Sequence, residues 1–180
     1  LIAAGADLVT FSGDKLLGAP QGGFIVGRRD LVERCRRHPL TRAVRVDKLT
    51  LAGIEATLKL YLEPQRAAER IPAVRMLTAT REQIAPRAEA LAGKLRAAGI
   101  ECEVIDGVSR AGGGALPGVD LPTRLVAVAH PAPQEVEARL RAFDPPVMVR
   151  IQAGLLLLDP RTLWDDELDV VVSALRSAIV

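Results

Sequence analysis

A single lysine, Lys15, lies in the stretch of sequence whose composition best suits covalent chemistry. A short strand signal, Asp-Leu-Val-Thr-Phe, precedes it at 7–11, and a second, Phe-Ile-Val, follows it at 24–26. Four glycines surround it: Gly13, Gly18, Gly22 and Gly23. A lysine between two apolar strands, with small residues that let a flat ligand approach the backbone, can be partly desolvated and made nucleophilic. The same spacing also fits an ordinary solvated loop lysine.

A second candidate is the pair Arg42 and Arg45, in a segment from 40 to 46 that has no clear periodicity. We expect this segment to be an extended or irregular connection. Two guanidiniums three residues apart can converge on one oxyanion, because each presents a planar fork of donors suited to phosphate. A solvated basic loop is the alternative interpretation.

The segment around Lys15 reads Thr-Phe-Ser-Gly-Asp-Lys-Leu-Leu-Gly at 10–18. It resembles the pyridoxal-phosphate lysine motif of the bacterial selenocysteine synthase family, the L-seryl-tRNA(Sec) selenium transferases. Later landmarks of that family follow in the same order: Arg42 to Thr50, a helix at 51–62, Gly112-Gly113-Gly114 with Leu116-Pro117-Gly118, and Leu155 to Arg161. The resemblance therefore covers essentially the whole chain.

The resemblance implies a transferase that uses pyridoxal 5'-phosphate (PLP) to convert L-seryl-tRNA(Sec) to L-selenocysteinyl-tRNA(Sec) with selenophosphate. It implies that Lys15 holds the cofactor as an internal Schiff base and then moves the α-proton, so that a dehydroalanyl intermediate forms. Arg42 and Arg45 become the candidate ligands of the donor phosphate. Ser12 and Gln21 become candidate cofactor contacts.

The implied fold class is α/β. Residues 1–70 would form the C-terminal part of a fold-type-I, aspartate aminotransferase-like PLP-binding domain, and 71–180 a small α+β C-terminal domain. Because the sequence starts at Leu1, at the entry to a strand, we interpret it as the C-terminal portion of a longer enzyme that is inactive alone. The family implies a cytoplasmic, ring-like homodecamer of dimers, with most cofactor and tRNA contacts upstream of Leu1.

Two other interpretations stay open. A related PLP-dependent lyase acting on a small amino acid or an amino-sugar acid phosphate would use the same lysine loop and the same arginines. A non-catalytic α/β binding domain would make Lys15 incidental.

Composition excludes several other classes. The chain has 180 residues, 49% of them hydrophobic, which is enough to bury a core. Its net charge of +2, from 24 basic and 22 acidic residues, gives no whole-chain field for nucleic acid, so we expect no DNA partner. Cys35 and Cys102 have neither metal-site nor disulfide spacing, which predicts no metal and a reducing cytoplasm. No apolar run approaches the ~20 residues that span a bilayer.

The elements that must position these residues follow from periodicity and from turn-forming residues. We predict a helix over 28–38 that Pro39 ends, and a helix over 51–62 that Asp47 caps and Pro64 ends. A helical stretch over 73–98 should be interrupted near Thr80 and near Pro86, and Gly99 should cap its end.

The rest of the sequence predicts short strands and helices in alternation. We expect strands at 101–108 and 125–130, then a helix at 133–143. A hairpin of 147–152 and 155–159 should turn at Ala153-Gly154. A last helix is expected at 165–179.

Overall fold

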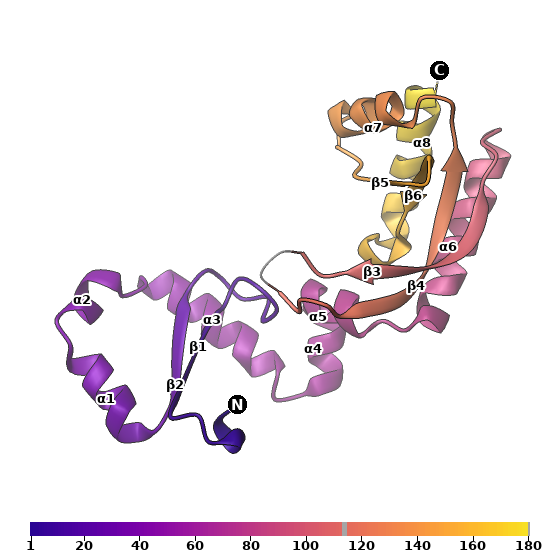
Figure 1. The fold of residues 1–180 in the computed structure, drawn as a ribbon. Coiled ribbons are helices and arrows are strands. Elements are labelled where there is room, and N and C mark those ends of the chain that lie inside the picture. Colours follow the sequence, from indigo (N-terminus) through magenta and orange to yellow (C-terminus); the bar gives the residue numbers. More distant parts are fainter. Residues whose placement is uncertain (113–114, 180) are drawn as a thin grey trace. The chain divides into compact units, whose positions relative to one another are not determined.

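The computed structural model describes residues 1–112 and 115–179, so two of the landmark glycines, Gly113 and Gly114, lie outside the described residues. Its internal contacts divide the chain into two units, Leu1–Thr78 and Ala79–Val180. Each unit mixes helices with antiparallel strands (Figure 1). The assignment of 1–70 and 71–180 as two functional domains stays a prediction.

The first unit is built around a β-hairpin. Strands β1 (Leu8–Ser12) and β2 (Gly23–Gly27) lie where strands were predicted, and they pair antiparallel with each other. The rings of Phe11 and Phe24 stack across the pair with centroids 4.8 Å apart. The hairpin therefore fixes both ends of the segment that carries Lys15.

Helices make up most of the remaining first unit. They are α1 (Arg29–Arg37), α2 (Leu40–Val44), α3 (Lys48–Leu60), α4 (Pro64–Arg70) and α5 (Pro72–Thr78), with a short 3-10 helix, η1 (Ile2–Ala4), before β1. The predicted cap of α3 is confirmed, since the Asp47 carboxylate accepts the backbone N–H groups of Leu49 and Thr50. That helix ends at Leu60, before Pro64, which begins α4 instead.

The expectation of an irregular connection at 40–46 was wrong in part, because α2 occupies Leu40–Val44. Pro39 is the reason. Proline ends the preceding helix, yet its fixed φ suits the start of the next, and Pro39 is the N-cap of α2 with φ −54°. Arg42 therefore lies within a helical turn, and Arg45 is the extended residue that follows it.

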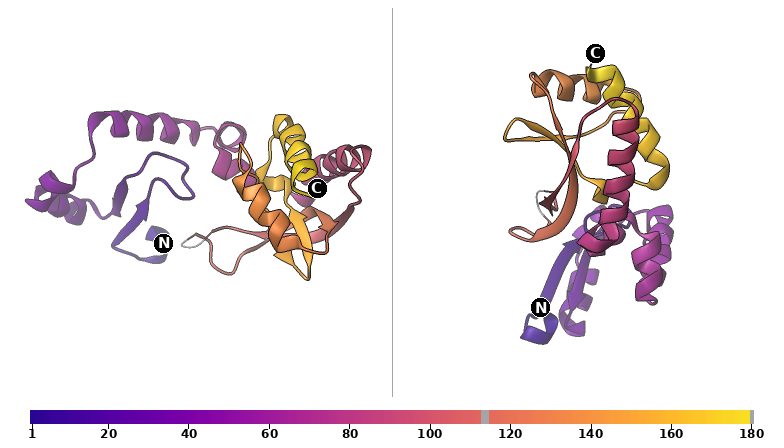
Figure 2. Two further views of the ribbon diagram at one scale, coloured as in Figure 1. Left: turned by 90° about the horizontal axis from the view of Figure 1, so that it is seen from above. Right: turned by 90° about the vertical axis from the view of Figure 1, so that its right-hand side faces the viewer.

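The second unit contains a four-stranded antiparallel sheet with the order β3-β4-β6-β5. Its elements are α6 (Arg81–Ala97), β3 (Glu103–Arg110), β4 (Asp120–Ala129), α7 (Pro133–Ala142), β5 (Arg150–Gln152), β6 (Leu155–Leu158), η2 (Pro160–Thr162), η3 (Asp165–Glu167) and α8 (Leu168–Ile179). Figure 2 shows α6 beside the long strand β4, which it contacts. The sheet is covered by helices on one face.

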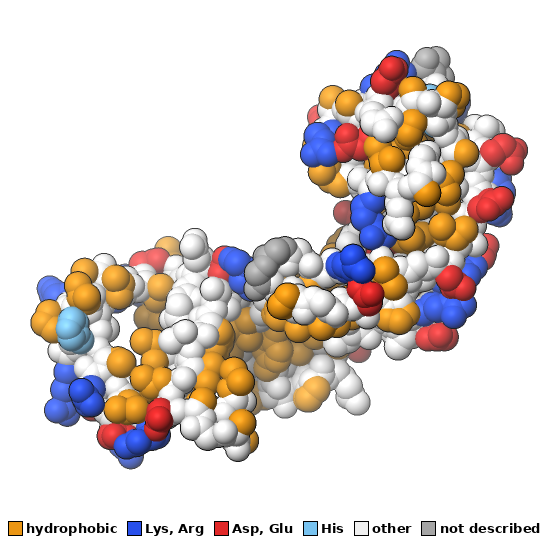
Figure 3. Space-filling model, viewed as in Figure 1, with side chains coloured by type: hydrophobic (Ala, Val, Ile, Leu, Met, Phe, Trp, Pro, Cys, Tyr) orange, Lys and Arg blue, Asp and Glu red, His pale blue; other side chains and the backbone are white. Residues whose placement is uncertain are grey.

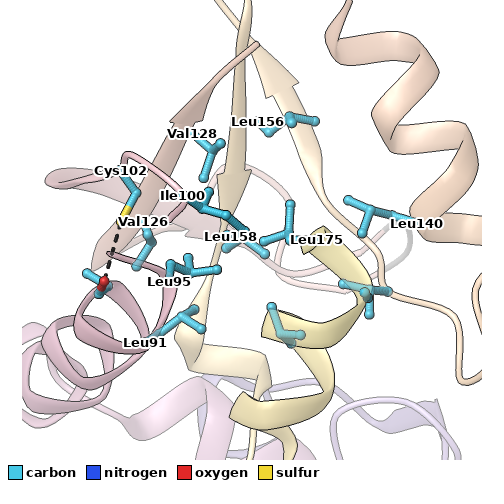
Figure 4. Close-up of a cluster of buried hydrophobic side chains, with 14 of the residues drawn as sticks. Leu91, Leu95, Ile100, Cys102, Val126, Val128, Leu140, Leu156, Leu158 and Leu175 are labelled. Atoms are coloured by element: carbon cyan, nitrogen blue, oxygen red, sulfur yellow. Dashed lines mark hydrogen bonds between the residues drawn. The ribbon is translucent and has the colours of Figure 1, made fainter. Parts of the chain in front are cut away.

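Alternation along the central strands separates the two faces of this sheet. Val126 and Val128 of β4 face the main core, whereas Leu125 and Ala127 face a smaller apolar cluster on the other side. Figure 4 shows the main core, where side chains from α6, α7 and α8 meet the sheet. Leu91, Leu95, Leu140, Leu156 and Leu175 are among its fully buried members.

Strand β4 begins at Asp120, five residues before the predicted start at 125. The prediction began too late because a proline, here Pro122, disfavours a strand. The structure accommodates this proline where β4 pairs only with β3, since pairing with β6 begins at Val126. Pro122 therefore costs no hydrogen bond on the β6 side.

The predicted break at Pro86 was also wrong, because α6 runs through it. Proline removes one intrahelical hydrogen bond and costs about 3 kcal/mol in a helix interior. The apolar face of α6 offsets that cost: Ile84, Ala88, Leu91, Ala92 and Leu95 are all buried. The break at Thr80 is confirmed, since Thr80 and Gln83 form a capping box.

Two residues with positive φ form the predicted turn between β5 and β6. Ala153 has φ +51° and Gly154 has φ +79°, and the flanking Gln152 and Leu155 pair directly. Such a two-residue connection matches the twist of antiparallel strands. The turn sets the register that buries Leu156 and Leu158.

A buried polar network joins the end of β6 to the other strands. Arg161 is 4% exposed, and its guanidinium donates to Ser109 Oγ at 2.9 Å, to the Ala79 carbonyl at 2.7 Å and to the Pro122 carbonyl at 2.6 Å. Ser109 Oγ donates in turn to Asp159 Oδ2 at 2.6 Å. Burial lowers the pKa of Arg161, and the charge of Asp159 opposes that shift. The network is structural, since its donors are satisfied inside the unit.

Candidate functional site

The lysine loop, residues 13–22, connects β1 to β2. Backbone hydrogen bonds close its base, from Gly13 N to the Gly22 carbonyl at 2.8 Å and from Ala19 N to the Gly13 carbonyl at 2.9 Å. A tight turn follows Lys15, whose carbonyl accepts the N–H of Gly18 at 3.1 Å. Lys15 is therefore held at a defined point of the loop.

Gly13 is required for this closure. It is buried, and a Cβ at this position would lie 2.7 Å from the Pro20 carbonyl oxygen. A backbone oxygen cannot move aside without opening the loop. The glycine spacing that singled out Lys15 in the sequence thus has a steric cause.

The Lys15 side chain is 54% exposed, and its Nζ donates a hydrogen bond to Asp14 Oδ2 at 2.7 Å. This hydrogen bond lowers the pKa of the Asp14 carboxyl group. The amine is accessible to a ligand, and the ionised Asp14 carboxylate beside it accepts its hydrogen bond. Sequence reasoning missed Asp14, although its adjacency to Lys15 was the signal.

Helix α3 supports the other limb of the lysine loop. The Tyr61 hydroxyl donates to the Leu17 carbonyl at 2.9 Å. A Cβ on Gly53 would lie 2.8 Å from Cγ of Pro20, so the helix and the loop approach closely at this glycine. Sequence reasoning treated α3 only as a core helix and missed these contacts, because the contacting residues are far apart along the chain.

A groove of about 1280 Å³ lies between the hairpin and the connection from α2 to α3. Ser12 and Arg45, both candidates from the sequence, line it together, and Lys48 adds a second cation. Arg42 and Gln21 are exposed and do not line this groove, nor does Lys15. The structure thus brings two of the five candidates together in one cavity.

Each of the two histidines accepts a hydrogen bond from a nearby backbone amide. His38 Nδ1 accepts the Leu40 N–H at 3.3 Å, and His130 Nδ1 accepts the Ala132 N–H at 3.1 Å. Cys35 and Cys102 are both free thiols.

Among residues 1–112 and 115–179, no three His, Cys, Asp or Glu side chains gather in a way that could hold a metal ion. Over the same residues, no helix has the length and apolarity to span a bilayer.

The family model described as "SelA: L-seryl-tRNA selenium transferase" matches residues 1–164. The chain belongs to this family. Its members named L-seryl-tRNA(Sec) selenium transferase include one from Solidesulfovibrio magneticus, 51% identical over 98% of this chain, and one from Geobacter sulfurreducens, 50% identical over 97%. The chain spans 39% of the length of each of these relatives.

Among solved structures, an adenosylmethionine-8-amino-7-oxononanoate aminotransferase from Methanocaldococcus jannaschii is 14% identical. The match covers 96% of this chain and 38% of that one, with a TM-score of 0.33. This likeness is too weak to bear on the fold. The family assignment rests on the sequence matches.

Proposed function

We propose that this chain is part of a PLP-dependent enzyme that converts L-seryl-tRNA(Sec) to L-selenocysteinyl-tRNA(Sec) with selenophosphate as the selenium donor. Membership of the family supports the reaction, and the relatives' names specify seryl-tRNA. The same names do not favour the small-molecule lyase. The observation that carries the proposal is an accessible amine, Lys15 Nζ, on a loop whose base is closed at Gly13.

The chemistry of the available groups fits the cofactor. A primary amine can attach to an aldehyde, and Ser12 and Arg45 line the same groove. When bound, PLP supplies that aldehyde and a ring that withdraws electrons from the substrate α-carbon. Ser12 and Gln21 are our proposed contacts to it.

Lys15 is the proposed catalytic residue. Once its Nζ is released by the substrate amino group, it can take the proton from the α-carbon and later return one. Asp14 lies within hydrogen-bond distance of Nζ and can orient the amine between these steps. The two adjacent residues would therefore act as a pair.

Arg42 and Arg45 are the proposed ligands of the phosphate of the selenium donor. Neither has a carboxylate partner among the described residues, so both guanidiniums have donors available for an anion. Arg45 lines the groove, whereas Arg42 lies one helical turn earlier, on α2. We expect Arg45→Ala to raise the KM for selenophosphate more than Arg42→Ala does.

The larger organisation is part of the same proposal. Residues 1–70 would complete a fold-type-I PLP-binding domain, and 71–180 would form its small α+β C-terminal domain. We propose a cytoplasmic enzyme that assembles as a ring-like homodecamer of dimers. The 180-residue chain alone is expected to be inactive and to bind PLP weakly; turnover of seryl-tRNA by the purified chain would contradict this.

The test uses the full-length protein with PLP, selenophosphate and tRNA(Sec) charged with labelled serine. We expect labelled selenocysteine after hydrolysis, and its loss in Lys15→Ala. Lys59→Ala is the matched control, because Lys59 is exposed in the same unit and pairs with Glu55 at 2.7 Å.

Borohydride reduction followed by peptide mass analysis separates the other interpretations. Pyridoxyl mass on Lys15 together with unchanged labelled serine would keep the cofactor and move the substrate to a small-molecule lyase. A protein without pyridoxyl mass on Lys15 would be the non-catalytic binding domain.

A further inference from the structure

The net charge of the whole chain conceals a strongly basic segment. Residues 28–48 contain eight Arg or Lys and three Asp or Glu, a net charge of +5. The rest of the chain contains sixteen basic and nineteen acidic residues, a net charge of −3. The net positive charge of this protein is therefore confined to residues 28–48, which we call the basic segment. It comprises α1, α2, their connections and Lys48 at the start of α3.

Ion pairs neutralise only part of the basic segment. Glu33 binds both Arg36 and Arg37 at 2.8 Å, and these hydrogen bonds lower the pKa of its carboxyl group to about 2. Arg28 is bound by Asp7 and Asp30. Within the described chain, five cations of the segment have no carboxylate partner: Arg29, Arg34, Arg42, Arg45 and Lys48.

Helix α1 presents two of these cations to solvent. Its apolar residues Leu31, Val32 and Cys35 are half-buried, whereas Arg29 and Arg34 are exposed. Their positions are separated by about 7.5 Å along the helix axis. Blue side chains gather over α1 at the left edge of Figure 3. With 3.6 residues per turn, Arg29 and Arg34 lie about 140° apart around α1, on the two flanks of the side that carries Asp30 and Glu33. That side is therefore charged and not apolar.

An extended polyanion fits this face better than a small anion does. Seven of the eight cations in the segment are arginines, whose planar forks bind phosphate oxygens with two donors each. The unpaired cations are spread over α1, α2, Arg45 and the start of α3, so they offer more positions than one phosphate group occupies. Because the apolar side of α1 is turned into the unit, a water-exposed phosphodiester backbone suits it better than a lipid surface.

We infer that the solvent-exposed side of α1, through Arg29 and Arg34 on its two flanks, binds the phosphodiester backbone of the tRNA substrate. The inference rests on the proposed function for the identity of the RNA. The face would contribute affinity and orientation without reading bases, as phosphate contacts do. Neither arginine belongs to the proposed catalytic or donor-binding groups.

The test measures binding of fluorescent tRNA(Sec) to the full-length protein over a series of salt concentrations. We expect Arg29→Gln/Arg34→Gln to weaken binding several-fold at low salt, and to reduce the slope of log K against log salt by about 1.5, since each phosphate contact contributes about 0.7 to 0.9. The kcat at saturating seryl-tRNA should be unchanged, with KM raised. Arg29→Lys/Arg34→Lys should restore most of the slope.

The matched control is Arg70→Gln/Arg176→Gln, which removes two exposed arginines outside the basic segment. An unchanged slope in the α1 variant, or an equal loss in the control, would overturn the inference. Failure of the wild-type protein to bind tRNA would also overturn it. So would an α1 variant that keeps tRNA binding and loses binding to phosphatidylserine vesicles. Failure of the proposed function would appear separately, as tRNA binding without labelled selenocysteine.

Loss of fold in the variants is not expected, because Arg29 opens α1 and removing a cation from a helix N-terminus is favourable. Equal far-ultraviolet circular dichroism and thermal midpoints in all four proteins verify this. The lysine variant then separates lost charge from lost packing.

Discussion

The hydroxyl of Tyr61, in α3, donates a hydrogen bond of 2.9 Å to the backbone carbonyl of Leu17, 44 residues earlier in the chain. Leu17 lies two residues after Lys15, so this bond ties the reactive loop to a helix. Burial raises the pKa of Tyr61, which keeps the hydroxyl protonated as a donor. The position of Lys15 thus depends on a residue that has no chemical role of its own.

We expect Tyr61→Phe to lower the free energy of unfolding by about 1 kcal/mol, the usual net contribution of one hydrogen bond. The amides of Gly18 and Ala19 should exchange faster with solvent, because the loop loses its tie to α3. Denaturant titration and amide exchange of the full-length protein measure the two effects. Exchange in β3 and β4 is the internal control, and equal acceleration there would contradict a local role.

Two helical glycines should respond to alanine with opposite signs. Gly93→Ala in α6 meets nothing within 4 Å, so we expect a gain of about 0.5 to 1 kcal/mol from helix propensity. Gly53→Ala in α3 places a methyl 2.8 Å from Pro20, so we expect a net loss of about 1 to 3 kcal/mol. Chemical denaturation compares them. A stabilising Gly53→Ala would show that the loop does not pack on α3.

Removing the guanidinium of Arg161 should destabilise the second unit. Arg161→Met leaves the carbonyls of Ala79 and Pro122 without their donor and Asp159 without its buried counter-charge. We expect the free energy of unfolding to fall by about 3 kcal/mol. Arg150, which lies 3.8 Å from Asp159, limits this loss because it still provides a positive charge. Denaturation followed by circular dichroism measures it. Arg150→Met is the control, and equal losses would argue against the buried network.

The cap of α3 should depend on pH. Hydrogen bonds from the Thr50 hydroxyl and from the Thr50 and Leu49 amides lower the pKa of Asp47. Its contribution is therefore complete above the ordinary carboxyl pKa of about 4 and is lost as pH falls through the lower folded-state value. Asp47→Ala should have a lower melting temperature than the wild type at pH 7, and this difference in melting temperature should become smaller in acid. Asp47→Asn should retain a cap that does not titrate. A difference in melting temperature between Asp47→Ala and the wild type that stays constant with pH would contradict a titrating cap.

Local signals in the sequence were sufficient for several elements. The apolar stretches flanking the lysine loop predicted β1 and β2, Asp47 predicted the start of α3, and Ala153-Gly154 predicted a turn, because each depends on neighbouring residues. Helix α2 was missed because five residues are too few to show a period. The helix through Pro86 and the early start of β4 were missed because tertiary packing overrode the local effect of proline.

The candidate site divides in the same way. Glycine spacing pointed to Lys15, since the closure at Gly13 is a local steric requirement. The contact from Tyr61 joins residues distant in sequence, and no periodicity encodes it. Arg161 entered only as part of a family landmark, because arginines are seldom buried and composition gives no sign of the exception.

Buried apolar side chains are shared unequally between the two units. In the described part of the first unit the buried hydrophobic residues are Ile54, Ala67 and Ile71, whereas the second unit has a continuous core. Unfolding should therefore be stepwise, and one free energy would not describe the chain. The sole tyrosine, Tyr61, lies in the first unit and the sole tryptophan, Trp164, in the second. The two intrinsic fluorophores thus report separate transitions without any added label.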